Sequence, residues 1–136
     1  MASTASSSGP GKLTAAILIV STTASANPAS DASDVALRDV FDSPDGGGGR
    51  WDVIETRIVP DVPAQIQRQI MLWTDVLESV NLIVTTGGTG FAVQDNTPEA
   101  ISTLLHRAAP GLVHAMLAAS LSVTPCRLSR RYHGRR

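Results

Sequence analysis

The sequence predicts an α/β fold, a three-layer α/β/α arrangement around a mainly parallel sheet. The apolar runs at 13–20 and 82–84 show no polar alternation, which is typical of strands that are covered on both faces. Segments with helical periodicity separate the strand-like segments, so βαβ units are expected. With 136 residues, 43 % hydrophobic and 17 % charged, the chain has the size and composition of one globular domain.

The N-terminal half contains two expected strands. Residues 1–11 are small and polar and are expected to form a disordered leader before the first strand at 13–20. Residues 34–41 suggest a short helix, and the four consecutive glycines within 43–50 indicate a loop. The second strand, 51–59, is less apolar and is expected nearer an edge. Its alternation predicts two faces: Val53, Glu55, Arg57 and Val59 on one, and Ile54, Thr56 and Ile58 on the other.

The C-terminal half begins with the clearest helix, at 61–80, with Pro63 in its first turn. A third strand is expected at 81–86. Thr97 then begins another helix, and Pro110-Gly111 separates that helix from the last one. The expected apolar faces consist of Leu37, Val40 and Phe41; Ile66, Ile70, Trp73 and Leu77; Ile101, Leu104, Leu105 and Ala108; and Leu112, Met116 and Ala119. Trp73 and Met116 are expected in the core.

Composition limits the classes of partner. The formal net charge of −1 predicts no nucleic-acid partner, although residues 127–136 form a basic tail. Cys126 is the only cysteine, which excludes an intrachain disulfide. No apolar run approaches the roughly 20 residues of a membrane-spanning helix. Lys12, the following apolar run and Ala24-Ser25-Ala26 also match a secretory signal, but a buried strand is the favoured interpretation.

A glycine-rich turn follows the third strand. Gly87, Gly88 and Gly90 lie directly after it, where parallel sheets bind ligands. Glycines allow positive φ angles and let backbone amides approach an anion without an intervening Cβ atom. The spacing matches neither a Walker A loop nor G-x-G-x-x-G, so a phosphate cradle and a plain tight turn both remain open.

Two aspartates are ambiguous in the same way. Asp61 follows the second strand and Asp95 follows the glycine-rich turn, and each precedes an expected helix. Either residue is a candidate helix N-cap. Alternatively, both carboxylates converge on one Mg²⁺ with a polyphosphate, since Mg²⁺ is bound by one or two carboxylates and by substrate phosphates.

Several segments together resemble a known family. NLIVTTGGTGFAVQDNTPEA at 81–100, IVPD at 58–61, APGL at 109–112 and LSR at 128–130 resemble the Mog-type molybdenum-cofactor biosynthesis domain, which is also the G domain of gephyrin. The resemblance extends from about Leu13 to Arg130, and the domain is expected to span 12–126. It implies a Mog-like fold and a cytoplasmic homotrimer that transfers AMP from Mg-ATP to molybdopterin.

The resemblance also implies roles for individual residues. Gly87, Gly88, Thr89 and Gly90 would hold phosphate, and Asp61 and Asp95 would position Mg²⁺ and ATP as the catalytic and metal-binding residues. Ser129 would lie near the pterin phosphate, and Ser21 occupies the strand-end position of the family's V-S-D motif.

The sequence departs from the family pattern at several points. The V-S-D motif reads Val20-Ser21-Thr22, the usual P-R before the signature aspartate reads Val93-Gln94, and Val62 replaces a second acid. After LSR the family continues into a strand, an N-x-P-G loop and a long helix, whereas this sequence reads RYHGRR. A fold without the last strand and helix is therefore expected. The alternative function is a degenerate, non-catalytic domain with a binding or assembly role.

Overall fold

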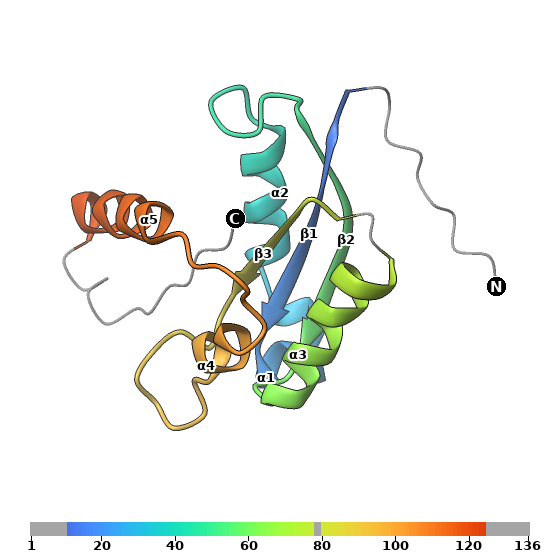
Figure 1. Ribbon diagram of the computed structural model, residues 1–136, viewed down its shortest axis with the longest axis vertical. Helices are drawn as coiled ribbons and strands as arrows, with labels where there is room; N and C mark the ends of the chain where they lie inside the picture. The colour runs from blue at the N-terminus through green and yellow to red at the C-terminus, as the bar shows by residue number, and fades with distance from the viewer. Residues whose placement is uncertain (1–10, 78–79, 125–136) are drawn as a thin grey trace.

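A computed structural model describes residues 11–77 and 80–124. The basic tail, Cys126, Ser129 and all but the last residue of the expected leader lie outside the described residues. The described part contains three strands and the helical segments between and after them (Figure 1). None of the helices among these residues combines the length and the apolar character that crossing a membrane requires.

The sheet is parallel and three-stranded, as predicted. Its strands are β1 (Leu13–Val20), β2 (Trp51–Val59) and β3 (Leu82–Thr86), in the order β2-β1-β3. The central strand is β1, which is buried without interruption from Ala15 to Val20. The apolar run that also matched a secretory signal is therefore the middle of the sheet. The expectation that residues 51–59 form an edge strand is also confirmed.

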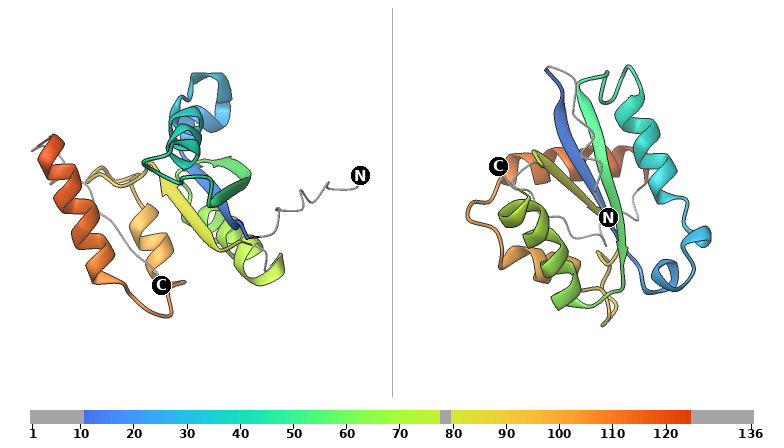
Figure 2. Two further views of the ribbon diagram at one scale, coloured as in Figure 1. Left: turned by 90° about the horizontal axis from the view of Figure 1, so that it is seen from above. Right: turned by 90° about the vertical axis from the view of Figure 1, so that its right-hand side faces the viewer.

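Helices cover both faces of this sheet, which confirms the three layers (Figure 2). Helix α2 (Ser33–Asp42) places Phe41 against Ala15, Ile17 and Ile19 of β1. Helices α3 (Pro63–Met71) and α4 (Thr97–Ser102) cover the opposite face. Residues of that face form the second core cluster: Ala16, Leu18, Val20, Ile66, Ile70, Trp73 and Ala100. Two short segments, α1 (Thr22–Ala26) and η1 (Pro28–Ser30), link β1 to α2.

An irregularity in β2 corrects its predicted faces. Ala15 pairs with Val53, but the next residue, Ala16, pairs with Glu55, so Ile54 is an extra residue in β2. An extra residue reverses the alternation of side chains beyond it. Val53 consequently packs in the α2 cluster with Ile58, whereas Val59 packs in the α3 cluster. Placing Val53 on the same face as Glu55 and Val59 was wrong.

The predicted long helix at 61–80 changes its pitch. Helix α3 begins at Pro63, and a π-helical turn, η2 (Leu72–Val76), follows Met71. Trp73 lies in this turn, is completely buried, and donates from Nε1 to Glu55 Oε2 at 2.7 Å. The wider turn shifts the residues after it around the helix axis, by about 100° for one added residue. Leu77 is therefore exposed instead of lying on the apolar face.

Other predicted apolar faces are only partly buried. Val40 of α2 is exposed. Helix α4 ends at Ser102 and does not continue to Ala108. The hydroxyls of Ser102 and Thr103 donate to the carbonyl oxygens of Glu99 and Ala100 at this end. Leu104 N donates to Ile101 O at 2.9 Å in this last turn.

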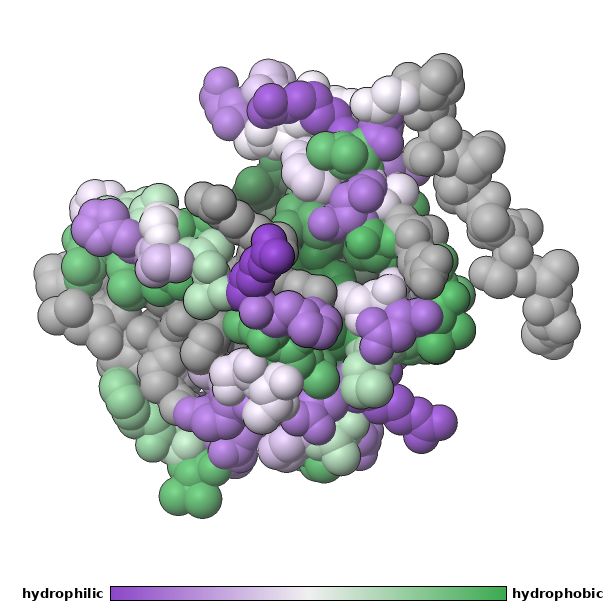
Figure 3. Space-filling model, viewed as in Figure 1, coloured by the Kyte–Doolittle hydropathy of each residue, from purple (hydrophilic) through white to green (hydrophobic). Residues whose placement is uncertain are grey.

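Helix α5 (Pro110–Val123) stands apart from the two helical layers (Figure 2). Pro110 is its first residue, so Pro110-Gly111 begins this helix rather than only separating it from α4. No residue of α5 is buried, and Met116 is 46 % exposed, so its assignment to the core was wrong. Apolar character alone does not show whether a helix has a packing partner. Figure 3 shows hydrophobic surface over α5 and over the loop between β3 and α4.

The packing of Trp73 yields a stability prediction. Trp73→Ala leaves a cavity between α3 and the sheet and removes the hydrogen bond to Glu55, so the free energy of unfolding is expected to fall by about 3–5 kcal/mol. Leu72→Ala, at the exposed neighbouring position, is the matched control and is expected to change it by less than about 1 kcal/mol. Urea denaturation of both variants measures the difference. Equal losses would contradict the assignment of Trp73 as a core residue.

Candidate functional site

The C-terminal ends of the three strands bring the candidate residues to one edge of the sheet. Val20 pairs with Val59, and Ser21 N donates to Val59 O at 2.8 Å, so β1 and β2 end together. The pairing of Ile19 with Thr86 places the end of β3 beside the end of β1. Ser21, Asp61 and Gly87 thus follow three adjacent strand ends. Ligands bind at this edge in parallel α/β sheets.

The glycine-rich turn packs tightly against this edge. Gly87 and Gly88 have φ angles of +92° and +62°, which L-residues with a side chain rarely adopt. A Cβ atom at Gly87 would collide with Val20 O, and one at Gly88 would collide with Thr97 Oγ1 and lie 3.1 Å from Asp61 Oδ1. Both positions therefore require glycine.

Two backbone amides of this turn, those of Gly88 and Thr89, have no acceptor among the described residues. The turn is half-buried rather than covered. Unpaired amides beside glycines in the left-handed region form a concave anion-binding geometry.

Asp61 is not the N-cap of α3. That cap is Val62, which makes no side-chain hydrogen bond to the helix. Asp61 Oδ2 instead accepts from the backbone amide of Thr22 at 2.9 Å and from the Thr22 hydroxyl at 3.0 Å. The other carboxylate oxygen, Oδ1, faces Gly88. Asp61 therefore joins the ends of β1 and β2 and presents one oxygen to the glycine-rich turn.

Asp95 lies against the other end of the same turn. Its Oδ2 accepts from Ala92 N at 3.3 Å, and a Cβ atom at Gly90 would lie 2.6 Å from that oxygen. The N-cap of α4 is Asn96, which makes no side-chain capping bond, and Asp95 is the residue before it. The two carboxylates thus contact one turn, Asp61 at Gly88 and Asp95 at Gly90.

Thr97, the first residue of α4, contacts the glycine-rich turn at Gly88. Sequence reasoning did not name it as a candidate site residue. It is 1 % exposed, its amide donates to Gly88 O at 3.1 Å, and its buried Oγ1 has no hydrogen-bond partner among the described residues. Gln67 of α3 fixes the helix that carries Thr97, because its Nε2 donates to Ala100 O at 3.1 Å. The sequence signals for Thr97 were its place at a helix start and its place in the segment 81–100 that resembles the family.

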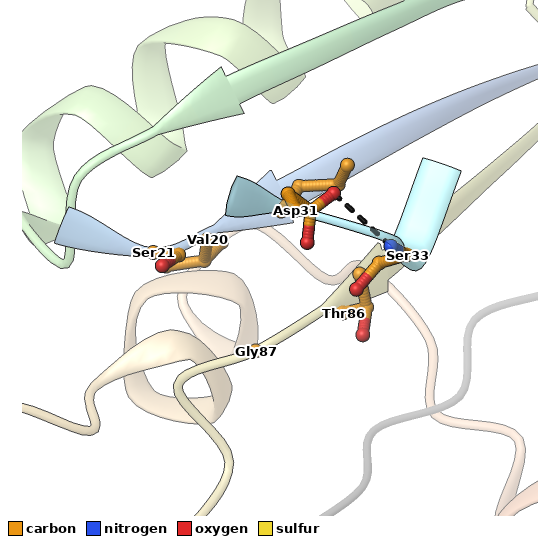
Figure 4. A pocket seen from close by; sticks show the side chains of 7 residues that line it. Val20, Ser21, Asp31, Ser33, Thr86 and Gly87 are labelled. Carbon is orange, nitrogen blue, oxygen red and sulfur yellow. Dashed lines mark hydrogen bonds between the residues drawn. The ribbon is translucent and has the colours of Figure 1, made fainter. Parts of the chain in front are cut away.

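Ser21 borders a cavity of about 450 Å³ beside the glycine-rich turn (Figure 4). Its side chain accepts from Ala24 N at 3.1 Å and so caps α1. Asp31, Ser33 and Thr86 also line this cavity, and sequence reasoning missed all three. Asp31 and Ser33 come from the irregular connection before α2 and its first residue, where no motif marks them.

The donors at this edge are two carboxylates and two backbone amides. Among the described residues no group of three or more His, Cys, Asp or Glu side chains gathers to hold a metal ion by itself. Two carboxylates beside a set of unpaired amides are nevertheless the combination that Mg²⁺ and a phosphate chain use together. Asp61 Oδ1 and Asp95 are the residues that would hold the ion.

This arrangement defines a class of protein: a three-layer α/β domain with a glycine-rich, acidic edge at the C-terminal ends of its parallel strands. Comparison with known proteins gives the family. The family described as "Probable molybdopterin binding domain" matches residues 16–133, and the chain belongs to it. Homologues include the G domain of gephyrin and MoaB and Mog proteins.

Individual relatives agree with this family. Gephyrin of Dictyostelium discoideum is 49 % identical over 69 residues, covering 51 % of this chain and 9 % of that protein. Molybdopterin adenylyltransferase of Escherichia coli K12 is 37 % identical over 81 residues, covering 60 % of this chain and 41 % of that enzyme. The chain thus spans less than half the length of these curated relatives. The crystal structure of the molybdopterin biosynthesis enzyme MoaB from Thermus thermophilus has a TM-score of 0.77 and 35 % identity, covering 89 % of this chain and 72 % of that one.

The glycine-rich turn yields a second prediction. Gly88→Ala introduces a side chain in the left-handed region against Thr97 and Asp61, and is expected to lower the free energy of unfolding by about 1–3 kcal/mol. Gly111→Ala is the control, because nothing lies within 4 Å of a Cβ atom there. It is expected to be neutral or to stabilise α5 by up to about 1 kcal/mol. Thermal unfolding measures both, and an unperturbed Gly88→Ala would show that the turn is more open than described.

Proposed function

We propose that the chain carries a molybdopterin adenylyltransferase site, which transfers AMP from Mg-ATP to the phosphate of molybdopterin. The observation that carries this proposal is that Asp61 and Asp95 adjoin one glycine-rich turn, in which the amides of Gly88 and Thr89 donate to no acceptor within 11–77 and 80–124. Membership of the molybdopterin-binding family and the similarity to molybdopterin adenylyltransferase of Escherichia coli support it. A homotrimeric assembly and a cytoplasmic location remain predictions of the family resemblance.

The reaction needs positioning and charge neutralisation more than it needs a protein nucleophile. An oxygen of the molybdopterin phosphate attacks the α-phosphorus of ATP, and the bond from that phosphorus to the bridging oxygen breaks to release pyrophosphate. The amides of Gly88 and Thr89 donate hydrogen bonds to phosphate oxygens and favour the charge that develops there. Asp61 and Asp95 would hold Mg²⁺, which would supply positive charge beside the phosphates.

The rigidity of the edge supports the same role. Asp61 is held by two hydrogen bonds from Thr22, and the turn is held by the hydrogen bond from Thr97 N to Gly88 O. Groups that are fixed before the substrate arrives need little reorganisation during the reaction. The same contacts would hold the two phosphates in line.

Substitution of the carboxylates tests the proposal. Asp61→Asn and Asp95→Asn each remove one negative charge from the Mg²⁺ site, and each is expected to lower the rate of AMP transfer to molybdopterin by roughly 10²–10³-fold. The measurement is the formation of adenylylated molybdopterin and pyrophosphate from Mg-ATP. Asp42→Asn, at the exposed end of α2 near the opposite edge of the sheet, is the control and is expected to keep the wild-type rate.

Two outcomes would count against this function. Product at background level with the wild-type chain, under conditions in which a full-length molybdopterin adenylyltransferase is active, would remove the catalytic proposal. Unchanged rates in both carboxylate variants would remove the assigned site.

A second candidate is a non-catalytic domain that binds molybdopterin or acts in assembly. One observation favours it: Thr22 stands where the family pattern has an aspartate, and its hydroxyl occupies Asp61 Oδ2. A carboxylate oxygen that is engaged in this way is less available to a metal ion. Tight molybdopterin binding without AMP transfer is the result that distinguishes this candidate.

Thr22→Asp tests the metal site without relying on turnover. A carboxylate at position 22 would lie beside that of Asp61, and two like charges in contact repel each other. The variant is expected to unfold at a lower temperature than the wild type in EDTA, and Mg²⁺ is expected to recover a larger part of its stability. Thr22→Asn, which adds no charge, is the control. If Mg²⁺ stabilises both variants equally, Asp61 does not lie at a metal site.

A further inference from the structure

The cavity beside the glycine-rich turn has a chemistry of its own. Its polar wall consists of the side chains of Ser21, Asp31, Ser33 and Thr86 together with the backbone of Gly87 (Figure 4). These residues come from the ends of β1 and β3 and from the start of α2. The cavity therefore opens on the α2 side of the same sheet edge, and it adjoins the turn at Gly87.

The polar groups of this wall have spare hydrogen-bonding capacity. Asp31 Oδ2 accepts from Ser33 N at 3.2 Å, which is the one hydrogen bond of this carboxylate within the described residues. The hydroxyls of Ser33 and Thr86 make none in that part of the chain. One carboxylate and two hydroxyls thus remain to bind a ligand.

The composition of the wall restricts the ligand class. The carboxylate of Asp31 disfavours an anion, and the described lining residues include no lysine or arginine to counter that charge. They also include no aromatic side chain on which a flat heterocycle would stack, since only Ile19 and Val20 are apolar. A small, non-planar group rich in hydroxyls matches this wall, because hydroxyls donate to a carboxylate and also exchange hydrogen bonds with other hydroxyls.

We propose that this cavity binds the ribose of the nucleotide, with Asp31 accepting hydrogen bonds from its vicinal hydroxyls and with Ser33 and Thr86 as additional partners. An acidic side chain plays this part toward ribose at the corresponding edge of dinucleotide-binding sheets. The proposal rests on the proposed function, because it assumes that the phosphates of the same nucleotide occupy the glycine-rich turn. It assigns Asp31 as a determinant of nucleotide specificity.

Isothermal titration of the full chain tests this assignment with two probes, Mg-ATP and Mg-2′,3′-dideoxy-ATP. The wild-type chain is expected to bind ATP about 10-fold or more tightly than the dideoxy analogue, as hydrogen bonds to a charged group imply. Asp31→Ala is expected to weaken ATP binding and to bring the two affinities together. Asp39→Asn, on the exposed side of α2, is the control and is expected to keep the wild-type ratio.

A second variant keeps the test decisive if Asp31→Ala does not fold. Thr86→Val retains the shape and strand preference of the side chain and removes only its hydroxyl, so a reduced ratio with normal stability supports the proposal. A wild-type ratio near one, or a ratio that neither variant changes, overturns it and leaves the proposed function intact. Loss of binding of a pterin phosphate by Asp31→Ala, with nucleotide binding unchanged, also overturns it. Absence of any ATP binding by the wild-type chain overturns both proposals.

Discussion

The burial of β1 on both faces is the constraint on which the rest of the structure depends. Ala15, Ile17 and Ile19 face α2, while Ala16, Leu18 and Val20 face α3 and α4. This strand lies in the middle of the sheet, and β2 and β3 pair with its two edges. Their registers then decide which residues meet at the strand ends: Asp61 from one side and the glycine-rich turn from the other.

The residues at this edge have structural tasks as well as the proposed chemical ones. Asp61 joins two strand ends through Thr22, Ser21 caps α1, and Gly88 leaves room for Thr97. Hydrogen bonds and close contacts between polar groups therefore connect the strand ends, α1 and the glycine-rich turn at this edge. Such an arrangement fixes the direction of Asp61 Oδ1 and of the free amides before any ligand binds. The residues of the family motif at this edge are therefore needed both for the fold and for the proposed site.

The sequence was informative where one physical signal dominated. The run at 13–20 lacks alternation because both faces are buried. The equally apolar run at 82–84 is only partly buried and lies at an edge, as the more polar β2 does, so apolar character alone did not distinguish the central strand from an edge strand. The faces of β2 were not predictable, because the extra residue Ile54 leaves no mark in composition. Met116 was misplaced because apolarity does not identify a packing partner. The capping interpretation of Asp61 failed because α3 begins one residue too late for it, and Asp31 and Ser33 had no motif to mark them.

The parallel topology has a consequence for how the chain folds. Every strand pairing closes a long crossover, from Leu13 to Trp51 and from Ala15 to Leu82. During synthesis the nascent chain therefore carries the apolar segment of β1 with no partner on its second edge until residue 86 has left the ribosome. Contacts between segments so distant in sequence form slowly and leave apolar edges accessible to other chains. The consequence of this topology is a period during synthesis in which the apolar face and edge of β1 are exposed before the sheet is complete.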